Sequence, residues 1–246
     1  MKDYLEPSVS LIIPFYNPGP YFRDHLLAVI SVLNSSGLNF ELIGVNDGSI
    51  DESDNVALSF SELTLISHSK NHGKGSALRT GFKAAQGQWI GFIDADGDLP
   101  ASQLEVYFNL IKSGEAKEFD SIIATKVHSD SIVHSGILRR SGTKGFHLLT
   151  NALFHLGLDD TQTGLKFFRR ELIESVIEQS TEDGFAIDVE LLCLAKIHGF
   201  KRVKYVPAII VKRHTSTISV KNSVKTLFDL FKLRRKITKI KSDSAK

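Results

Sequence analysis

The sequence has little cysteine and no long apolar segment, and both shortages limit what the chain can be. Among 246 residues there is a single cysteine, Cys193, so an intramolecular disulfide is excluded. It falls in the apolar helical pattern 189–195, which predicts a buried structural thiol rather than a reactive one. No apolar run approaches the ~20 residues of a membrane-spanning helix. Pro14 and nearby acidic residues interrupt the first apolar run, unlike a signal peptide, so we expect a cytoplasmic protein.

Several motifs are missing as well, and each absence argues against an enzyme class. The nine histidines show no H-E-x-x-H spacing, so a zinc site is not expected. There is no G-x-S-x-G sequence to support a hydrolase. Gly-Lys at 73–74 is followed by glycine, not by the Ser or Thr of a nucleoside triphosphate-binding loop. Phe-Tyr-Asn at 15–17 is neither the glycine-rich turn of dinucleotide-binding proteins nor the loop of a sugar-nucleotide pyrophosphorylase.

The net charge of +2 conceals a basic C-terminal segment. Nine of the 30 Lys and Arg residues but two of the 28 Asp and Glu residues lie in 221–246, so this segment carries +7 and the rest −5. We therefore expect no nucleic-acid partner and divide the chain into a main domain, 1–215, and a basic tail, 216–246. Apolar residues at helical spacing between the lysines predict a basic amphipathic helix over 222–240. It is either a solvated basic face or a peripheral anchor on an anionic membrane surface.

The order of apolar segments predicts an α/β fold with a mostly parallel, Rossmann-like sheet flanked by helices, because strand-like and helix-like segments alternate. The expected strands of the first half are Val9–Pro14, Phe40–Val45, Leu63–His68, Trp89–Asp94 and Ser121–Thr125. The expected helices between them are Tyr21–Leu33, Ser53–Phe60, Ser76–Ala85 and Gln103–Lys112. In the second half we expect helices over Leu138–Leu156 and Ile187–Ile197 and strands over Leu165–Phe168 and Val203–Val211.

Polar loops follow the expected strands, and one of them is strongly acidic. In an open parallel sheet, ligands bind beyond the carboxyl ends of the strands. Asp94, Asp96 and Asp98 alternate behind a buried strand, so an extended chain would project them to one side. Converging carboxylates repel one another unless a cation lies between them, and oxygen-only ligands favour Mg²⁺ or Mn²⁺ together with substrate phosphates. The pattern predicts an open site for a nucleoside diphosphate.

Six stretches in a fixed order extend this prediction to a family. They are "IIPFYN", "VNDGSID", "NHGKGSALRTG", "IDADGD", "DTQTGLKFFRR" and "GFAIDVELL", and they cover roughly residues 8–215. With them the chain resembles the family 2 glycosyltransferases of GT-A fold, within them the polyprenyl-phosphate sugar transferases, and most closely the dolichyl-phosphate β-glucosyltransferases. The last two stretches discriminate this group, since the first four occur across many family 2 enzymes.

The resemblance implies roles for individual residues. The nucleotide-sugar-binding residues would be Pro14, Tyr16, Asn17, Asp47, Asn71, Gly73, Lys74, Asp94, Ala95 and Asp96, with Asp47 reading the nucleobase. The metal ligands would be Asp94, Asp96 and Asp98, the acceptor-binding residues Arg139, Arg140, Gln162 and Lys166, and the catalytic residues Asp96, Asp188 and Lys166. Two features depart from the family: the usual Asp-Asp-Gly-Ser begins with Asn46, and the membrane helices of many relatives are absent.

The reaction implied by the resemblance is inverting and metal-dependent, moving a hexose, most simply glucose from UDP-glucose, to a polyprenyl phosphate at the cytoplasmic face of a membrane. A phosphate acceptor is already ionised and needs no strong general base, whereas a sugar hydroxyl needs one. Asp188, Glu182 and Asp183 are candidates for such a base, although Asp188 equally suits a structural role at the head of a helix. The alternatives are a saccharide acceptor in cell-surface polysaccharide assembly and a non-catalytic module that binds nucleotide sugars.

Overall fold

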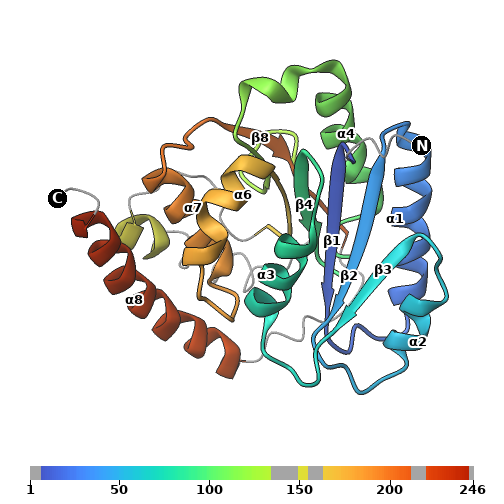
Figure 1. Cartoon of the computed structure of the whole chain (residues 1–246), viewed down its shortest axis with the longest axis horizontal. Helices are drawn as coiled ribbons and strands as arrows, with labels where there is room; N and C mark the ends of the chain where they lie inside the picture. Colours follow the sequence, from blue (N-terminus) through green and yellow to red (C-terminus); the bar gives the residue numbers. More distant parts are fainter. Residues whose placement is uncertain (1–6, 134–148, 155–162, 212–219, 244–246) are drawn as a thin grey trace, which may run out of the picture.

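A computed structural model of the chain describes residues 7–133, 149–154, 163–211 and 220–243. Its centre is a seven-stranded sheet with the order β3-β2-β1-β4-β7-β5-β8 (Figure 1). These strands are β1 (Val9–Phe15), β2 (Phe40–Asn46), β3 (Leu63–Ser67), β4 (Trp89–Ile93), β5 (Ser121–Thr125), β7 (Leu165–Arg169) and β8 (Val203–Pro207). The predicted α/β class is thereby confirmed, because helices lie between most successive strands.

β7 runs antiparallel to the strands on either side of it. β1 to β4 are parallel, whereas β7 is antiparallel to both of its neighbours, β4 and β5. In this register Leu165, the first residue of β7, pairs with Ile93, the last residue of β4. The start of β7 therefore lies at the edge of the sheet where β1 to β4 end, which we call the carboxyl edge.

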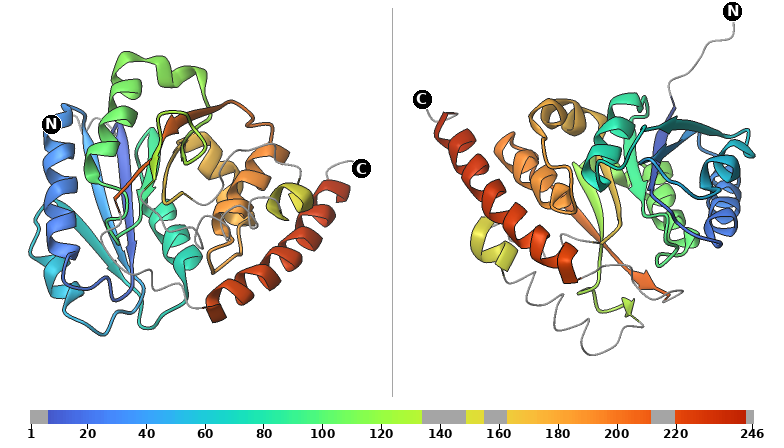
Figure 2. Two further views of the ribbon diagram at one scale, coloured as in Figure 1. Left: turned by 180° about the vertical axis from the view of Figure 1, so that it is seen from behind. Right: turned by 90° about the horizontal axis from the view of Figure 1, so that it is seen from below.

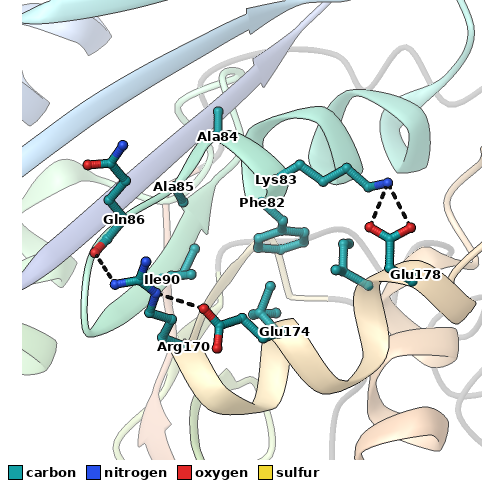
Figure 3. Close-up of a pocket in the computed structure, with 11 residues that line it drawn as sticks. Phe82, Lys83, Ala84, Ala85, Gln86, Ile90, Arg170, Glu174 and Glu178 are labelled. Carbon is teal, nitrogen blue, oxygen red and sulfur yellow. Dashed lines mark hydrogen bonds and ion pairs between the residues drawn. The ribbon is translucent and has the colours of Figure 1, made fainter.

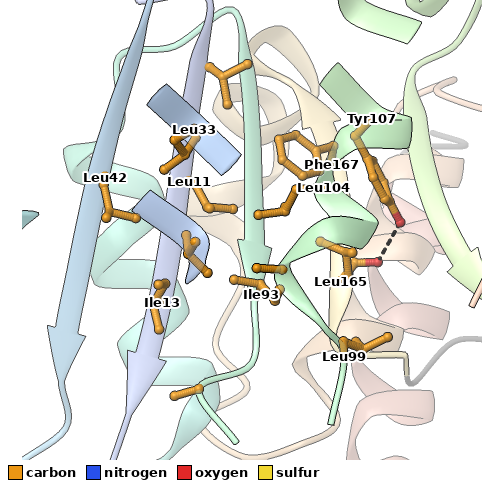
Figure 4. Close-up of a cluster of buried hydrophobic side chains, with 14 of the residues drawn as sticks. Leu11, Ile13, Leu33, Leu42, Ile93, Leu99, Leu104, Tyr107, Leu165 and Phe167 are labelled. Carbon is orange, nitrogen blue, oxygen red and sulfur yellow. Dashed lines mark hydrogen bonds between the residues drawn. The ribbon is translucent and has the colours of Figure 1, made fainter. Parts of the chain in front are cut away.

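Helices cover both faces of the sheet and create two hydrophobic cores. Strand residues alternate between the faces, as in β1, where Leu11 and Ile13 point to one core and Ile12 to the other. The first core is closed by α1 (Phe22–Ser36) and α4 (Leu104–Ser113), and Figure 4 shows Tyr107 of α4 packed beside Phe167. The second is closed by α3 (Lys74–Ala84), α6 (Arg170–Val176) and α7 (Ile187–Ile197). Cys193 of α7 is buried there, as predicted, and burial raises the pKa of its thiol to about 12.

The remaining elements show where the sequence-based expectations were incomplete. The predicted strand Val203–Val211 is two strands, because after β8 the chain continues as β9 (Ile209–Ile210), which pairs with β6 (Ile132–Val133) in a separate small sheet. Of the predicted helix Leu138–Leu156, residues 149–154 are helical and the rest lies outside the described residues. Between β2 and β3 runs the short helix α2 (Ser53–Leu58).

The last helix, α8 (Val220–Asp243), runs along the outside of α7 (Figure 2). Its Leu230, Leu233 and Ile237 are buried in the second core. Among the described residues, no helix is both long enough and apolar enough to cross a membrane.

Candidate active site

The loops after β1 and β2 are joined at the carboxyl edge. The backbone N–H of Asn17 donates to Oγ of Ser49 at 3.0 Å, and the side-chain oxygen of Asn17 accepts from the backbone N–H of Ile50 at 2.9 Å. Tyr16 beside them is 47% exposed. Pro14 is a buried residue of β1, so it can contribute to this edge only through the position of its backbone. The pair of loops presents an aromatic ring and polar backbone at one place.

Asp47, at the end of β2, holds a neighbouring loop in place. Its buried carboxylate accepts hydrogen bonds from the backbone N–H groups of His72 (3.0 Å) and Gly73 (2.7 Å) and from Nδ1 of His68 (2.8 Å). Nε2 of His68 lies 2.9 Å from the hydroxyl of Thr80 in α3. The carboxylate predicted to read the nucleobase is thus already bonded to three groups of the chain itself. His68 was missed by the sequence analysis, because a single histidine after a strand carries no spacing signal.

Gly48 allows the loop 68–73 to approach the end of β2 closely. Its φ is +72°, and a Cβ at this position would lie 2.3 Å from the backbone carbon of Lys70. Glycine alone tolerates both conditions. The Asp-Gly-Ser sequence is therefore needed for the loop contact as well as for the turn.

Lys74 forms an ion pair with Asp94 at the centre of the carboxyl edge. Its Nζ lies 2.6 Å from Oδ1 of Asp94, 3.7 Å from Oδ2 of Asp188 and 5.1 Å from the centre of the Phe92 ring. Burial lowers the pKa of Lys74, but the charges of Asp94 and then Asp188 outweigh that effect and raise it above its usual range. Lys74 is therefore a fixed positive charge beside Asp94.

A second lysine, Lys166, is buried close to Lys74, and both lie near Asp188. Lys166 of β7 is 0% exposed, and its Nζ contacts Oδ1 of Asp188 at 2.6 Å and the carbonyl oxygen of Thr163 at 2.5 Å. Asp188, in the first turn of α7, thereby links both lysines. The interpretation of Lys166 as a residue facing the acceptor phosphate stays a prediction. In this structure its ammonium group is buried and its contacts are with Asp188 and Thr163.

The predicted convergence of three carboxylates is wrong in its geometry. β4 ends at Ile93, and the chain turns at residues 95–96 and bends again at 98–99, with Gly97 at φ 69°, so the alternation of an extended strand does not continue. We call residues 94–98 the acidic turn. Asp98 instead donates its backbone N–H to Oδ1 of Asp96 at 3.0 Å. Throughout the part of the chain that the structure describes, no three His, Cys, Asp or Glu residues gather as metal ligands would.

Asp94 and Asp96 still form a pair suited to a hard cation. The side chain of Asp96 is exposed, but partial desolvation of its carboxyl group and then the charge of Asp94 raise its pKa to about 6. Both residues offer oxygen ligands, as Mg²⁺ and Mn²⁺ prefer, and a divalent cation relieves the repulsion between them. The donor set therefore fits a metal held by two carboxylates and a substrate diphosphate, and the third predicted ligand, Asp98, stays a prediction.

Gly164 makes room for Asp94. A Cβ at residue 164 would lie 2.0 Å from Oδ2 of Asp94, and the backbone N–H of Asp94 donates to the carbonyl of Gly164 at 2.9 Å. Gly164 precedes β7, so this contact joins the acidic turn to the start of that strand.

Replacing Gly164 with alanine should displace the Asp94 carboxylate from Lys74. We expect a loss of about 1–3 kcal/mol in the free energy of unfolding, the usual cost of overpacking, together with weaker metal binding. Urea unfolding and Mn²⁺ titration measure the two effects. Gly184→Ala is the matched control, because there the nearest atom, at 3.1 Å, ends the flexible Glu182 side chain. Wild-type stability and metal affinity in Gly164→Ala would contradict the assignment.

The segment 180–184 closes the site from the side of α7. The backbone N–H of Gly75 donates to the carbonyl of Asp183 at 2.8 Å, and Arg79 pairs with the Asp183 carboxylate. Glu190, fully buried in α7, accepts from the hydroxyl of Ser180 at 2.6 Å and from the N–H of Glu182 at 3.0 Å. The sequence analysis missed Glu190, although a charged residue inside the apolar run 187–195 was a usable signal.

Of the other predicted site residues, some lie at this edge and the others fall outside the described residues. Asn71 and Gly73 lie in the loop held by Asp47, and Ala95 is a buried residue of the acidic turn. Arg139, Arg140 and Gln162 lie outside the described residues.

A separate groove of about 460 Å³ lies between α3 and α6 (Figure 3). Ion pairs border it, Lys83 with Glu178 at 2.9 Å and Arg170 with Glu174 at 2.9 Å. It contains Ile90, near the start of β4, and none of the predicted site residues. It is therefore at the opposite end of that strand from the acidic turn and is not the candidate site.

Comparison with known proteins gives consistent matches. The family model described as glycosyl transferase family 2 matches residues 10–177. The dolichyl-phosphate beta-glucosyltransferase of Saccharomyces cerevisiae is 29% identical, covering 79% of this chain and 64% of that protein. The enzyme of the same name from Drosophila melanogaster is 31% identical, covering 80% and 65%. The chain thus spans just under two thirds of the length of these relatives.

Solved structures resemble the chain in fold. Glucosyl-3-phosphoglycerate synthase from Mycobacterium tuberculosis, crystallised with Mn²⁺, UDP and glucosyl-3-phosphoglycerate, superposes with a TM-score of 0.71 at 18% identity. The match covers 93% of this chain and 80% of that one. At this identity the likeness concerns the fold alone.

Proposed function

Because the chain belongs to glycosyl transferase family 2, we propose that it is an inverting, metal-dependent transferase that moves glucose from UDP-glucose to a polyprenyl phosphate. The fold agrees with the predicted GT-A architecture. The similar proteins named dolichyl-phosphate beta-glucosyltransferases support the lipid-phosphate acceptor, and the structural neighbour crystallised with UDP and Mn²⁺ supports the donor and the metal.

The donor would lie along the carboxyl edge. The exposed ring of Tyr16 offers an apolar plane for the base, while Asp47 keeps the loop 68–73 in position. Lys74 places a positive charge next to Asp94, where a diphosphate would lie against the acidic turn. Asp94 and Asp96 would hold Mg²⁺ or Mn²⁺, which supplies Lewis-acid stabilisation of charge on the leaving diphosphate.

The burial of Asp188 and its contacts with two lysines are the observation that favours a phosphate acceptor. Its carboxylate is buried, bonded to Lys166 at 2.6 Å and near Lys74 at 3.7 Å, so it is not placed to accept a proton from a hydroxyl. A phosphate monoester is already largely dianionic at neutral pH and can attack the anomeric carbon without a base. Asp188 therefore acts as a positioning residue in this proposal, as Lys166 does.

A saccharide acceptor is the second candidate, and Glu182 is the residue that favours it. Burial, and then the nearby carboxylates of Asp229, Glu190 and Asp183, raise the pKa of Glu182, as suits a general base. A Glu182→Gln variant with full transfer to a lipid phosphate would remove this candidate.

The direct test combines donor binding with transfer. UDP-glucose and GDP-mannose are titrated into the full chain by calorimetry, with and without Mn²⁺, and labelled donor is then incubated with dolichyl phosphate or with a panel of saccharides. We expect Mn²⁺-dependent binding of UDP-glucose and a labelled lipid product. Binding without any lipid product would favour the saccharide acceptor, and binding of neither nucleotide sugar by folded protein would overturn the proposed donor.

A further inference from the structure

The outer side of α8 carries large apolar side chains next to basic ones. Leu227 is 38% exposed, Phe228 66% and Phe231 52%. Lys232, Arg235 and Lys239 are exposed on the same helix. We call these six residues the α8 outer face. Elsewhere in the described chain the exposed large apolar residues are more widely spaced along the sequence, such as Ile50, Leu58 and Val127, which is ordinary for a protein surface.

The inner side of the helix fixes the direction of this face. Leu230, Leu233 and Ile237 are buried against the second core, and Nζ of Lys236 lies 2.7 Å from the buried carboxylate of Glu190. Figure 2 shows α8 at the margin of the molecule, with α7 on one side. The sequence interleaves two sets of apolar residues, and the structure shows that one of them is already used for packing. The exposed set remains for a partner.

The composition of the face points to a lipid surface with negative charge. Aromatic and leucine side chains can enter the boundary between head groups and acyl chains, while neighbouring Lys and Arg attract anionic head groups. A second copy of the chain fits poorly, because a symmetric contact would bring two strongly basic tails together. We propose that the α8 outer face docks this protein on anionic membranes, with Phe228 and Phe231 inserted and Lys232, Arg235 and Lys239 at the head groups.

The docking surface is connected to the candidate site through direct contacts. Lys236 bonds to Glu190 and, at 2.8 Å, to the hydroxyl of Thr181. Glu190 in turn holds the N–H groups of 181 and 182, and the next residue, Asp183, bonds to Gly75 beside Lys74. A membrane under α8 would therefore lie at a fixed position relative to the acidic turn. The role of this fixed position in catalysis rests on the proposed lipid-phosphate acceptor, whereas membrane docking itself does not.

Co-sedimentation of the full chain with vesicles tests the docking. The vesicles are phosphatidylcholine alone or mixed with phosphatidylglycerol, and they contain neither donor nor polyprenyl phosphate, so failure here is separate from failure of the transferase assignment. We expect binding to the anionic vesicles only. Lys232→Glu/Arg235→Glu should weaken it at least about 25-fold, since each basic residue near such a surface contributes roughly a factor of five. Phe228→Ser/Phe231→Ser should weaken it similarly.

Matched controls separate this face from general charge and hydrophobicity. Lys117→Glu/Lys201→Glu makes the same change in charge at exposed sites on other elements, and Leu58→Ser removes a side chain that is 67% exposed on α2. Both should bind like the wild type. Point variants are preferable to removal of residues 221–246, which would also take away the buried Leu230 and Ile237 and expose the part of the second core that they cover. Equal binding by all variants overturns the proposal, as does loss of a dimer without loss of vesicle binding in Phe228→Ser/Phe231→Ser.

Discussion

Replacing Lys166 with alanine should lower the free energy of unfolding by about 3–5 kcal/mol, the largest stability effect that we expect from a single substitution in this site. The variant would leave the Asp188 carboxylate buried without its closest cation, 2.6 Å away, and would open a cavity behind Phe92. For a chain of this size the melting temperature should fall by roughly 6–20 °C. Chemical denaturation followed by circular dichroism measures the loss.

Two further variants establish that charge compensation is the cause. Lys83→Ala breaks an ion pair of similar length with Glu178, but both partners are exposed, so we expect a change below about 0.5 kcal/mol. Lys166→Met/Asp188→Leu removes both buried charges together and should recover much of the loss. If the free energy of unfolding of Lys166→Ala lies within about 1 kcal/mol of the wild-type value, the pairing is refuted.

Asp96→Ala should reduce transfer by about a thousand-fold, the largest effect on activity that we expect. The metal that Asp94 and Asp96 would hold contributes several kcal/mol of stabilisation to the leaving diphosphate, and each 1.36 kcal/mol is about tenfold in rate. Initial rates with labelled UDP-glucose measure the effect, and calorimetry with Mn²⁺ measures the accompanying loss of donor affinity. Asp130→Asn, in an exposed loop, is the control and should retain full activity.

The same variant should remain folded, and the pKa of Asp96 gives the reason. A carboxyl group whose pKa is raised from 3.8 to about 6 binds its proton more tightly in the folded state. Its contribution to stability is therefore present at low pH and is lost as the pH rises from about 4 to about 6. At neutral pH without metal, Asp96→Ala should thus be at least as stable as the wild type. A lower melting temperature at pH 7.5 with chelator present would instead assign Asp96 a structural role.

The sequence was informative wherever structure depends on neighbouring residues. The strand Ser121–Thr125 and the helix Ile187–Ile197 have the predicted limits, and the first four strands differ from prediction by a residue at one end. In these segments the apolar pattern and the β-branched content both act locally. The positions of the loops at the carboxyl edge follow from the same alternation.

Contacts between distant segments were not accessible in this way. The antiparallel direction of β7 depends on its pairing with β4, and no residue within β7 specifies it. The burial of Lys166 follows from that pairing. The ion pair of Lys74 with Asp94 is likewise a contact between separate segments, α3 and the residues after β4. At the acidic turn a local pattern was misleading. The aspartates of residues 94–98 alternate in the sequence as on one side of a strand, but the strand ends at Ile93 and the chain bends there.

The inverted direction of β7 also has a consequence for biosynthesis. Strands β1 to β4, with Tyr16, Asp47 and Asp94, leave the ribosome within the first hundred residues, but Gly164, Lys166 and Asp188 follow much later. A nascent chain that has completed β5 can pair β1 with β2 and β4, yet it lacks the strand that lies between β4 and β5 in the final sheet. Such long-range pairings form slowly, because loop closure precedes them. Interrupted translation would therefore release a protein that has the carboxyl edge of β1 to β4 but an open sheet at β4, a surface on which chaperones or proteases would act.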